Sequence, residues 1–207
     1  MEVKLYHTGA LQVNTYLVYD DTKEAFIVDP GGYSNDLAYA VEKLGLNVRY
    51  ILLTHGHFDH IGGVPDFQKE YPEAVTVGFE KEKKTFADSR MNISSMFSRT
   101  PMFIKVDQYV EDNETMKIGD MELKFLFTPG HTPGGMSILL ENVVFCGDTL
   151  FQQSIGRTDF PGGSFEVLAD SIRNRLYTLP EDTIVLPGHM GQTTIGAEKA
   201  YNMFVRG

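Results

Sequence analysis

Short segments of alternating or continuous apolar residues, bounded by turn residues, recur along this chain. They predict strands over 3–7, 14–19, 25–29, 49–53, 115–118, 121–128, 136–140, 143–145 and 183–186, with a further strand near residue 75. Apolar residues at helical spacing predict helices over 34–44, 62–71, 164–179 and 194–204. Strands interleaved with a few helices indicate a layered α/β architecture.

Two of the predicted helices carry clear boundary signals. Ser34 or Asn35 can cap the helix over 34–44, and Gly45 follows its last apolar residue. Pro65 falls in the first turn of the next helix, where a missing N–H costs little.

Residues 85–104 follow neither pattern. Phenylalanine, methionine and isoleucine are mixed there with serine, asparagine and arginine, without clear periodicity. Methionine and phenylalanine form adaptable apolar surfaces, so one interpretation is a flexible wall or lid over a binding site. The alternative is an ordinary helix packed on the sheet, or a dimer contact.

The bulk properties suit one soluble domain. A length of 207 residues allows a substantial core, and we expect a single domain over 1–207. No apolar run approaches the ~20 residues that cross a bilayer, and the N-terminus leads directly into a predicted strand. We therefore expect a cytoplasmic protein with no membrane partner. Cys146 is the only cysteine, which excludes an intramolecular disulfide and suits a reducing compartment.

The charge distribution argues against a nucleic-acid partner. The formal net charge is −10, and no basic tract is longer than 81–84 (KEKK). An extended basic surface that could follow a phosphate backbone is therefore not expected. A small molecule is the expected substrate.

The densest cluster of histidine and aspartate residues lies in segment 54–60 (THGHFDH), directly after the apolar residues 50–53. His55 and His57 can point the same way from a nearly extended backbone, whereas Asp59 and His60 are neighbours whose side chains diverge. This spacing favours two adjacent metal sites over one. Imidazole and carboxylate ligands suit zinc, iron or manganese, and the lack of cysteine among them argues against a closed structural zinc site.

Three more residues of the same chemical types follow predicted strands. His131 lies in 129–134 (PGHTPG), Asp148 follows the strand over 143–145, and His189 follows a Pro-Gly turn after 183–186. Ligands at strand ends can meet at the common edge of packed sheets. We therefore expect these three side chains to converge with segment 54–60.

Other polar residues have ordinary interpretations. His7 lies outside every motif and is expected to be a strand residue without a chemical role. Cys146 is expected to be a small buried hydrophobe, with metal-driven oxidation as the alternative. Thr54 and Asp29 could support a ligand histidine, but strand termination and turn initiation explain them equally well.

The order of these motifs resembles the metallo-β-lactamase superfamily. HxHxDH is followed by Pro-Gly-His-Thr, by Gly-Asp and by a final Gly-His, and the resemblance continues through 156–159 (GRTD) and 187–196 (PGHMGQTTIG). Compact glyoxalase II-like hydrolases, which act on hydroxyacylglutathione, are the most similar members. The resemblance implies a four-layer αββα sandwich with the metal site at the shared strand-end edge of its two sheets.

The same resemblance implies how the ligands divide between two divalent ions. The seven are His55, His57 and His131 on the first ion, Asp59, His60 and His189 on the second, and Asp148 bridging both. Zinc is favoured, with iron and manganese as alternatives. Two such ions would lower the pKa of a shared water to about 7, and Asp59 is assigned the catalytic role of orienting the resulting hydroxide.

Hydrolysis of an acyl thioester is the leading functional interpretation. A thiolate leaves readily, and no spare residue is obviously placed as a general acid. Glyoxalase II adds a C-terminal helical domain that binds glutathione, and no such separate domain is expected within this chain. Arg157 stands where that family uses a lysine and is a candidate substrate-binding residue, while a structural pair with Asp159 is the alternative. Gly191 replaces a tyrosine of the family.

Other enzyme classes stay open. A persulfide dioxygenase would bind a single iron through His55, His131 and Asp148. A lactonase or β-lactamase is less favoured, because many β-lactamases of this fold place cysteine at the position of Asp148. A non-catalytic module would lack a ligand, and none is missing. The oligomeric state is not determined by the sequence.

Overall fold

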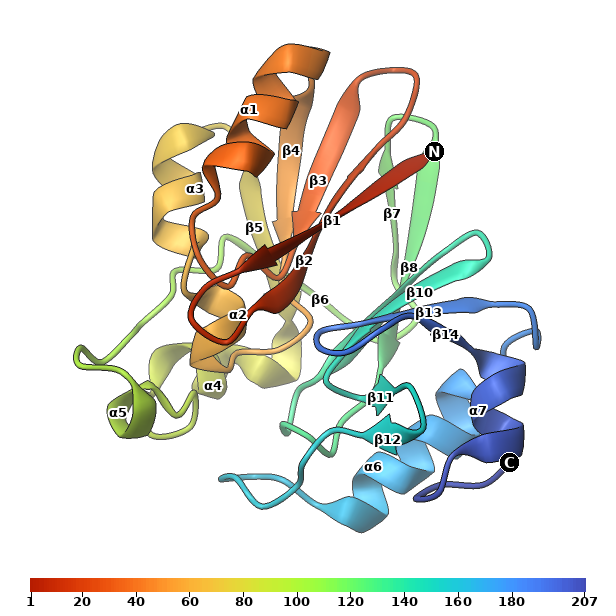
Figure 1. The fold of residues 1–207 in the computed structure, drawn as a ribbon. Helices are drawn as coiled ribbons and strands as arrows, with labels where there is room; N and C mark the ends of the chain where they lie inside the picture. Colours follow the sequence, from red (N-terminus) through yellow and green to blue (C-terminus); the bar gives the residue numbers. More distant parts are fainter.

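The computed structural model describes residues 1–207 and contains two six-stranded sheets packed face to face. Figure 1 shows helices on the outer side of each sheet. The predicted four-layer αββα sandwich is therefore confirmed. None of the helices combines the length and the apolar character that a membrane span requires.

The N-terminal sheet has the strand order β1-β2-β3-β4-β5-β6. Its strands are β1 Glu2–Thr8, β2 Val13–Tyr19, β3 Glu24–Val28, β4 Asn47–Leu52, β5 Val75–Phe79 and β6 Gln108–Val110. The first three pair antiparallel, and β3 to β6 pair parallel. The helical connections α1 Asn35–Leu44 and α3 Val64–Glu70 cover its outer face (Figure 1).

The second sheet has the order β14-β13-β10-β9-β8-β7. Its strands are β7 Thr115–Ile118, β8 Met121–Phe127, β9 Met136–Leu140, β10 Val143–Gly147, β13 Ile184–Pro187 and β14 Thr193–Thr194. Helices α6 Phe165–Ser171 and α7 Ile195–Tyr201 cover its outer side, and a small hairpin of β11 Leu150–Phe151 and β12 Ser154–Ile155 lies beyond β10 (Figure 1).

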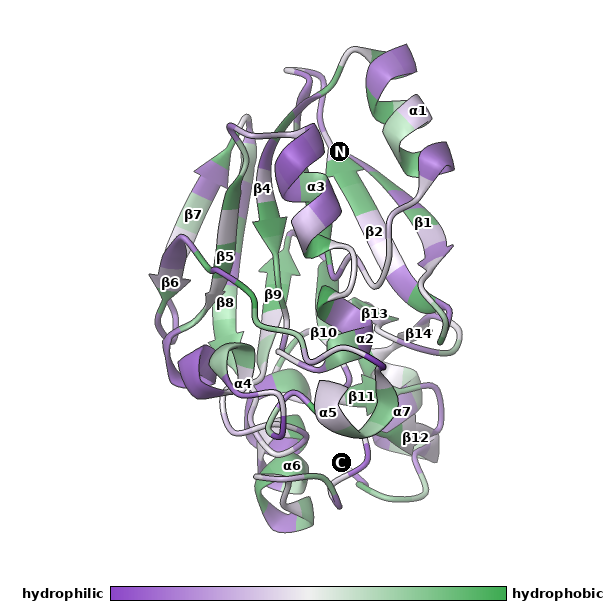
Figure 2. Cartoon of the chain, turned by 90° about the vertical axis from the view of Figure 1, so that its left-hand side faces the viewer, coloured by the Kyte–Doolittle hydropathy of each residue, from purple (hydrophilic) through white to green (hydrophobic).

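The central strands are buried on both faces, which explains their nearly continuous apolar sequences. In β3, Phe26 and Val28 face the core between the sheets, whereas Ala25 and Ile27 pack under the helices. Figure 2 shows these strands as mostly hydrophobic, with hydrophilic residues on α1 and α3.

Most predicted elements agree with the structure, and the differences lie at their ends. Ser34 caps α1 and Gly45 ends it with a φ of 62°. The helix predicted over 62–71 is α3, with Pro65 in its first turn, and a short helix that was not predicted, α2 Phe58–Ile61, precedes it. The helix predicted over 164–179 is α6 continued by a π-helical turn, Ile172–Leu176. The last helix ends at Tyr201, after which the Asn202 carboxamide oxygen accepts the N–H groups of residues 204 and 205.

Residues 85–104 form no long helix. They contain the end of α4 Lys83–Ala87 and the short α5 Ser94–Phe97, joined by irregular backbone. Neither helix is long enough to produce a helical repeat in the sequence, which explains the missing periodicity.

Substitution of Phe145 tests the packing between the sheets. Phe145 is fully buried, and its ring makes edge contacts with Tyr16 and Phe26 at centroid distances of 5.3 and 6.3 Å. Phe145→Ala should lower the free energy of unfolding by about 3–5 kcal/mol, because it leaves a cavity in the core. Urea unfolding measures this loss. Phe103→Ala, at a side chain that is 64% exposed, is the control and should change stability by less than about 0.5 kcal/mol. Equal effects of the two substitutions would contradict this description of the core.

Candidate metal centre

The candidate ligands reach one edge of the sandwich because the strands that carry them end there. Strands β8 and β10 are both antiparallel to β9, and β10 is parallel to β13, so all three run in the same direction. The residues that follow β4, β8, β10 and β13 are, in that order, segment 54–60, His131, Asp148 and His189. Segments far apart in the sequence thus meet at the edge shared by the two sheets.

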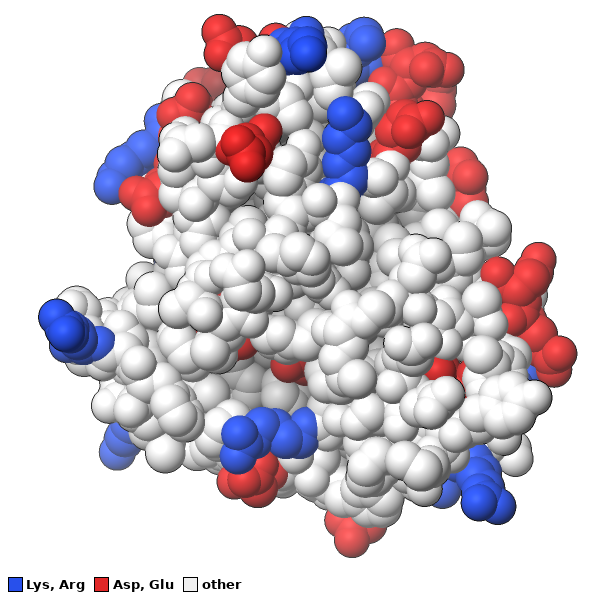
Figure 3. Space-filling model, viewed as in Figure 1, with Lys and Arg blue, Asp and Glu red and all other residues white.

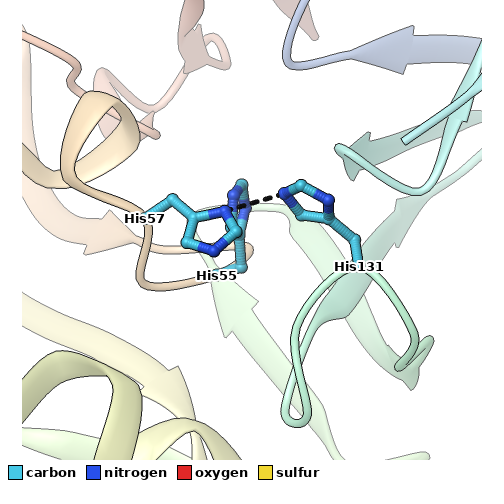
Figure 4. Close-up of side chains that lie close together, drawn as sticks. All are labelled: His55, His57 and His131. Atoms are coloured by element: carbon cyan, nitrogen blue, oxygen red, sulfur yellow. Dashed lines mark hydrogen bonds between the residues drawn. The ribbon is translucent and has the colours of Figure 1, made fainter. Parts of the chain in front are cut away.

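Three histidines form the first group. The nearest ligand atoms of His55, His57 and His131 all lie within 4.8 Å of one another. Figure 4 shows the three imidazoles facing a common centre, with His57 Nδ1 2.8 Å from His131 Nε2. All three side chains are buried.

Asp59, His60 and His189 form a second group, again within 4.8 Å. His189 Nε2 lies 3.2 Å from Asp59 Oδ2, and His60 Nε2 lies 3.7 Å from the same oxygen. Asp148 lies between the two groups. Its Oδ1 is 3.3 Å from His60 Nε2, and its Oδ2 is 3.6 Å from His131 Nε2 and 3.8 Å from His189 Nε2.

Several buried polar atoms at this centre have no hydrogen-bond partner. They are Nε2 of His55, Nε2 of His57, Nε2 of His60 and Oδ1 of Asp148. Buried polar atoms without partners are costly and rare in native proteins. Because imidazole and carboxylate groups are ligands of divalent transition metals, the residues present fit such ions.

Asp29 binds His60 at Nδ1, the ring nitrogen that faces away from Asp148. Its carboxylate accepts hydrogen bonds from the Thr54 N–H at 2.8 Å, the Thr54 hydroxyl at 2.5 Å and His60 Nδ1 at 3.0 Å. This directs His60 Nε2 toward Asp148, the arrangement in which a carboxylate orients a metal-binding imidazole. Of the two interpretations of Asp29 and Thr54, support of a ligand histidine is the one that the geometry favours.

His131 and His189 are oriented by backbone contacts. His131 Nδ1 donates to the Arg157 carbonyl at 2.7 Å, which leaves Nε2 facing the centre. The loop before His189 is held by Asn14, whose Nδ2 donates to the carbonyls of Pro187 and Met190 at 3.0 and 2.9 Å.

Burial and neighbouring charges set the protonation states. Burial and adjacent imidazoles lower the pKa of His55 well below its ordinary value and lower the pKa of His57 to about 3. Burial also lowers the pKa of His131. Burial opposes the charge on His60 too, but the carboxylates of Asp148 and Asp59 outweigh it and raise the pKa of that imidazole. The three imidazoles of the first group are thus held neutral, the state that binds metal.

No sequence pattern singled out Glu82 or Asn14, although both are buried at the site. Burial raises the pKa of Glu82 to about 7, against the effect of its backbone hydrogen-bond donors. In the sequence, Glu82 is the one acidic residue of the charged segment 81–84 (KEKK), a composition that is typical of a solvent-exposed surface.

A cavity of about 590 Å³ opens above the centre. His57, Asp59, His131, Asp148 and His189 lie on its surface, and the remaining lining residues are mostly apolar. In the space-filling view of Figure 3, acidic atoms are visible within the hollow of this face.

The other residues considered from the sequence lie as follows. Arg157 lines the cavity, and its Nε and Nη2 each donate to the carboxylate of Asp159 at 2.7 Å, so its role in substrate binding stays a prediction. His7 is exposed on β1. Cys146 is buried, with Sγ 3.2 Å from the Leu150 carbonyl.

Comparison with known proteins identifies the family. The profile of the Metallo-beta-lactamase superfamily matches residues 8–189. The chain belongs to this superfamily. The membership supports a metal-dependent hydrolase, and the histidine and aspartate clusters fit divalent metals.

Two curated relatives span nearly the whole chain. Hydroxyacylglutathione hydrolase GloC of Haemophilus influenzae is 37% identical over 99% of this chain and 98% of its own. The probable metallo-hydrolase YqgX of Bacillus subtilis is 39% identical over 96% of this chain and 95% of its own.

Three solved structures are also similar. The BLEG-1 B3 metallo-β-lactamase superposes with a TM-score of 0.93 at 40% identity and covers 100% of both chains. TTHA1623 in a di-iron-bound form superposes with a TM-score of 0.87 at 31% identity, over 98% of this chain and 100% of its own. ETHE1 from Myxococcus xanthus superposes with a TM-score of 0.82 at 30% identity, over 98% of this chain and 84% of its own.

Removal of the Asp29 carboxylate tests its support of the centre. Asp29→Ala leaves His60 Nδ1 and the Thr54 N–H without an acceptor, so zinc affinity should fall by about 10- to 100-fold. Competition with a chromophoric chelator measures the affinity. Asp21→Ala, at an exposed aspartate in the turn before β3, is the control and should bind zinc as the wild type does. Unchanged affinity in Asp29→Ala would show that His60 needs no such support.

Proposed function

We propose that this chain is a dinuclear metal-dependent hydrolase that cleaves an acyl thioester in the cytoplasm. The observation that carries the proposal is the position of Asp148 between two three-residue groups of ligand type. The first ion is assigned to His55, His57 and His131, the second to Asp59, His60 and His189, with Asp148 shared. Zinc is the favoured metal. Because both sheets contribute ligands, we also propose that residues 1–207 act as one catalytic unit.

Two divalent ions so placed would lower the pKa of a water molecule to about 7 and polarise the substrate carbonyl. Asp59 lies on the cavity surface with its Oδ2 directed to His189. Its carboxylate can accept a hydrogen bond from the attacking water and thereby orient it.

The composition of the cavity favours a substrate with a good leaving group. Among the lining residues outside the proposed ligand set, the only polar ones are Ser154 and Arg157. Neither is a general acid at neutral pH, so an amine or alkoxide leaving group would find no proton donor among them. A thiolate leaves without protonation. The similarity to a hydroxyacylglutathione hydrolase supports the same class of substrate.

Two other activities have specific support. The similarity to ETHE1 favours a persulfide dioxygenase with one iron on His55, His131 and Asp148, but the remaining ligand-type residues would then be idle. The similarity to BLEG-1 favours hydrolysis of a β-lactam. Opening of the lactam ring breaks a C–N bond and leaves a nitrogen that must be protonated, and the cavity offers no acid for this step.

Substitution of the second-ion ligands tests the proposal. Asp59→Asn and His189→Ala should each lower kcat/KM for a thioester by roughly 100-fold or more, because the nucleophile loses its orientation and one ion loses a ligand. Elemental analysis of the active wild type should find two metal ions per chain, and His7→Ala, at an exposed histidine, should retain full activity.

The activity assays should compare lactoylglutathione, an uncharged thioester, a lactone and a cephalosporin. Glutathione persulfide should be assayed as well, by measuring oxygen uptake. Intact thioester turnover in either ligand variant would overturn the two-ion mechanism. Oxygen uptake with one iron per chain would favour the dioxygenase instead.

A further inference from the structure

Aromatic rings form one wall of the cavity above the metal centre. Phe58 and Phe97 stack with an interplanar angle of 12° and a centroid distance of 5.8 Å. Phe160 meets Phe97 edge-on, also at 5.8 Å. Apart from the candidate ligands, the rest of the lining is mostly apolar and includes Leu11 and Met190.

This wall is held in place by hydrogen bonds. The Phe58 N–H donates to the carbonyl of the buried Asn92 at 2.9 Å, and Asn92 Nδ2 donates to the Met102 carbonyl at 2.8 Å. The hydroxyl oxygen of Ser94 accepts the Met102 N–H at 2.9 Å. Helix α5, which carries Phe97, is therefore tied to the segment that carries the histidines. Met102 itself contributes backbone contacts here and does not line the cavity.

Large apolar side chains remain exposed at the mouth of the cavity. Phe97 is 57% exposed, Leu11 53% and Met190 55%. A substrate seated between them would remove apolar surface from water, which is the usual source of affinity in such pockets.

The same cavity offers no free cation. Arg157 is the only lysine or arginine in its lining, and both nitrogens that face Asp159 are paired with that carboxylate. Its guanidinium also lies 3.8 Å from the centroid of the Phe160 ring. Figure 3 shows mostly uncharged atoms around the hollow, with basic and acidic atoms adjacent at its lower rim. A carboxylate on the substrate would have to compete with Asp159 for its partner.

We propose that the cavity selects thioesters with an apolar, branched or aromatic acyl group on an uncharged thiol, ahead of thioesters of a charged peptide thiol. This inference rests on the proposed thioester hydrolysis and names its substrate class. Phe97 is the specificity-determining residue, since it contacts both other rings of the wall and is the most exposed of the three.

The test compares thioesters after correction for their rates of hydrolysis by hydroxide alone. Phenylacetyl and lactoyl esters of N-acetylcysteamine differ only in the acyl group, and lactoylglutathione adds the charged carrier. We expect kcat/KM for the phenylacetyl ester to exceed both others by at least about tenfold, as one well-buried aromatic group allows. Phe97→Ala should remove most of this preference through KM. Phe103→Ala, outside the cavity, should preserve it.

A preference for lactoylglutathione, or an equal loss on all substrates in Phe97→Ala, would overturn the substrate class while leaving thioester hydrolysis intact. Failure of the metal-loaded protein to cleave any thioester would overturn both.

A second, independent observation concerns Glu82, at the end of the 3₁₀ turn Glu80–Glu82. Its side chain is fully buried. One carboxylate oxygen accepts the Gly56 N–H at 3.0 Å, and the other accepts the Gly134 N–H at 2.7 Å. Gly56 lies between His55 and His57, and Gly134 lies in the loop of His131. A single carboxylate therefore joins the two loops that carry the first histidine group.

The glycines make this close approach possible. A Cβ on Gly134 would overlap the backbone of Glu82, and a Cβ on Gly56 would lie 2.9 Å from Cγ2 of Thr85. Both loops are thus packed directly against the segment that carries Glu82. We infer that Glu82 is a positioning residue that sets the spacing between His57 and His131 without contacting the metal.

Glu82→Gln tests this inference because an amide has one acceptor oxygen and cannot accept both N–H groups. Zinc affinity, measured against a chromophoric chelator, should fall by about 10- to 100-fold, and the absorption spectrum of the cobalt-substituted protein should change. Glu82→Asp keeps two acceptor oxygens and should recover part of the affinity.

Glu198→Gln is the matched control. Glu198 is equally buried and accepts hydrogen bonds from Gln153, Thr193 and Asn202, away from the histidines. This variant should lose stability but keep the zinc affinity and the cobalt spectrum of the wild type. Wild-type affinity in Glu82→Gln, or equal losses of affinity in Glu82→Gln and Glu198→Gln, would overturn the inference.

Discussion

Seven side chains that carry charge or bind cations are crowded at the edge shared by the two sheets, and most of them are buried there. Such crowding is unfavourable unless the polar atoms find partners, and four of them find none within the protein. Divalent ions are partners that suit this set of imidazoles and carboxylates. The strand directions and the buried supporting residues bring these groups together and hold them there.

The support comes from both sheets. Asp29, at the end of β3, orients His60, and Glu82, after β5, joins the loops of the first histidine group. Asn14, on β2, reaches across to the loop of His189 in the opposite sheet. Each contact fixes a backbone or an imidazole rather than a metal, so the geometry of the centre is a property of the whole sandwich.

The chemistry and the cavity are consistent with each other. A centre with no nearby general acid suits a leaving group that departs as an anion, and apolar walls suit a substrate with little charge. The one lysine or arginine in the lining, Arg157, is paired with Asp159, so a substrate carboxylate would have to compete for it. The candidate ligands and the aromatic wall are different residues, so catalysis and substrate selectivity can be tested with separate substitutions.

The sequence by itself determined the candidate ligands, the strands they follow and the capped helix α1, because these depend on local spacing and on turn residues. It did not determine the short elements β6, β11, β12 and β14, whose two or three residues carry no readable period. Only the tertiary structure revealed Glu82, Asn14 and the ring contacts of the aromatic wall, which the sequence offered as one of the interpretations of residues 85–104. Their contacts join residues 52 positions apart for Glu82 and Gly134 and 173 apart for Asn14 and Pro187, and such pairings arise from the packing of the two sheets, which local patterns do not encode.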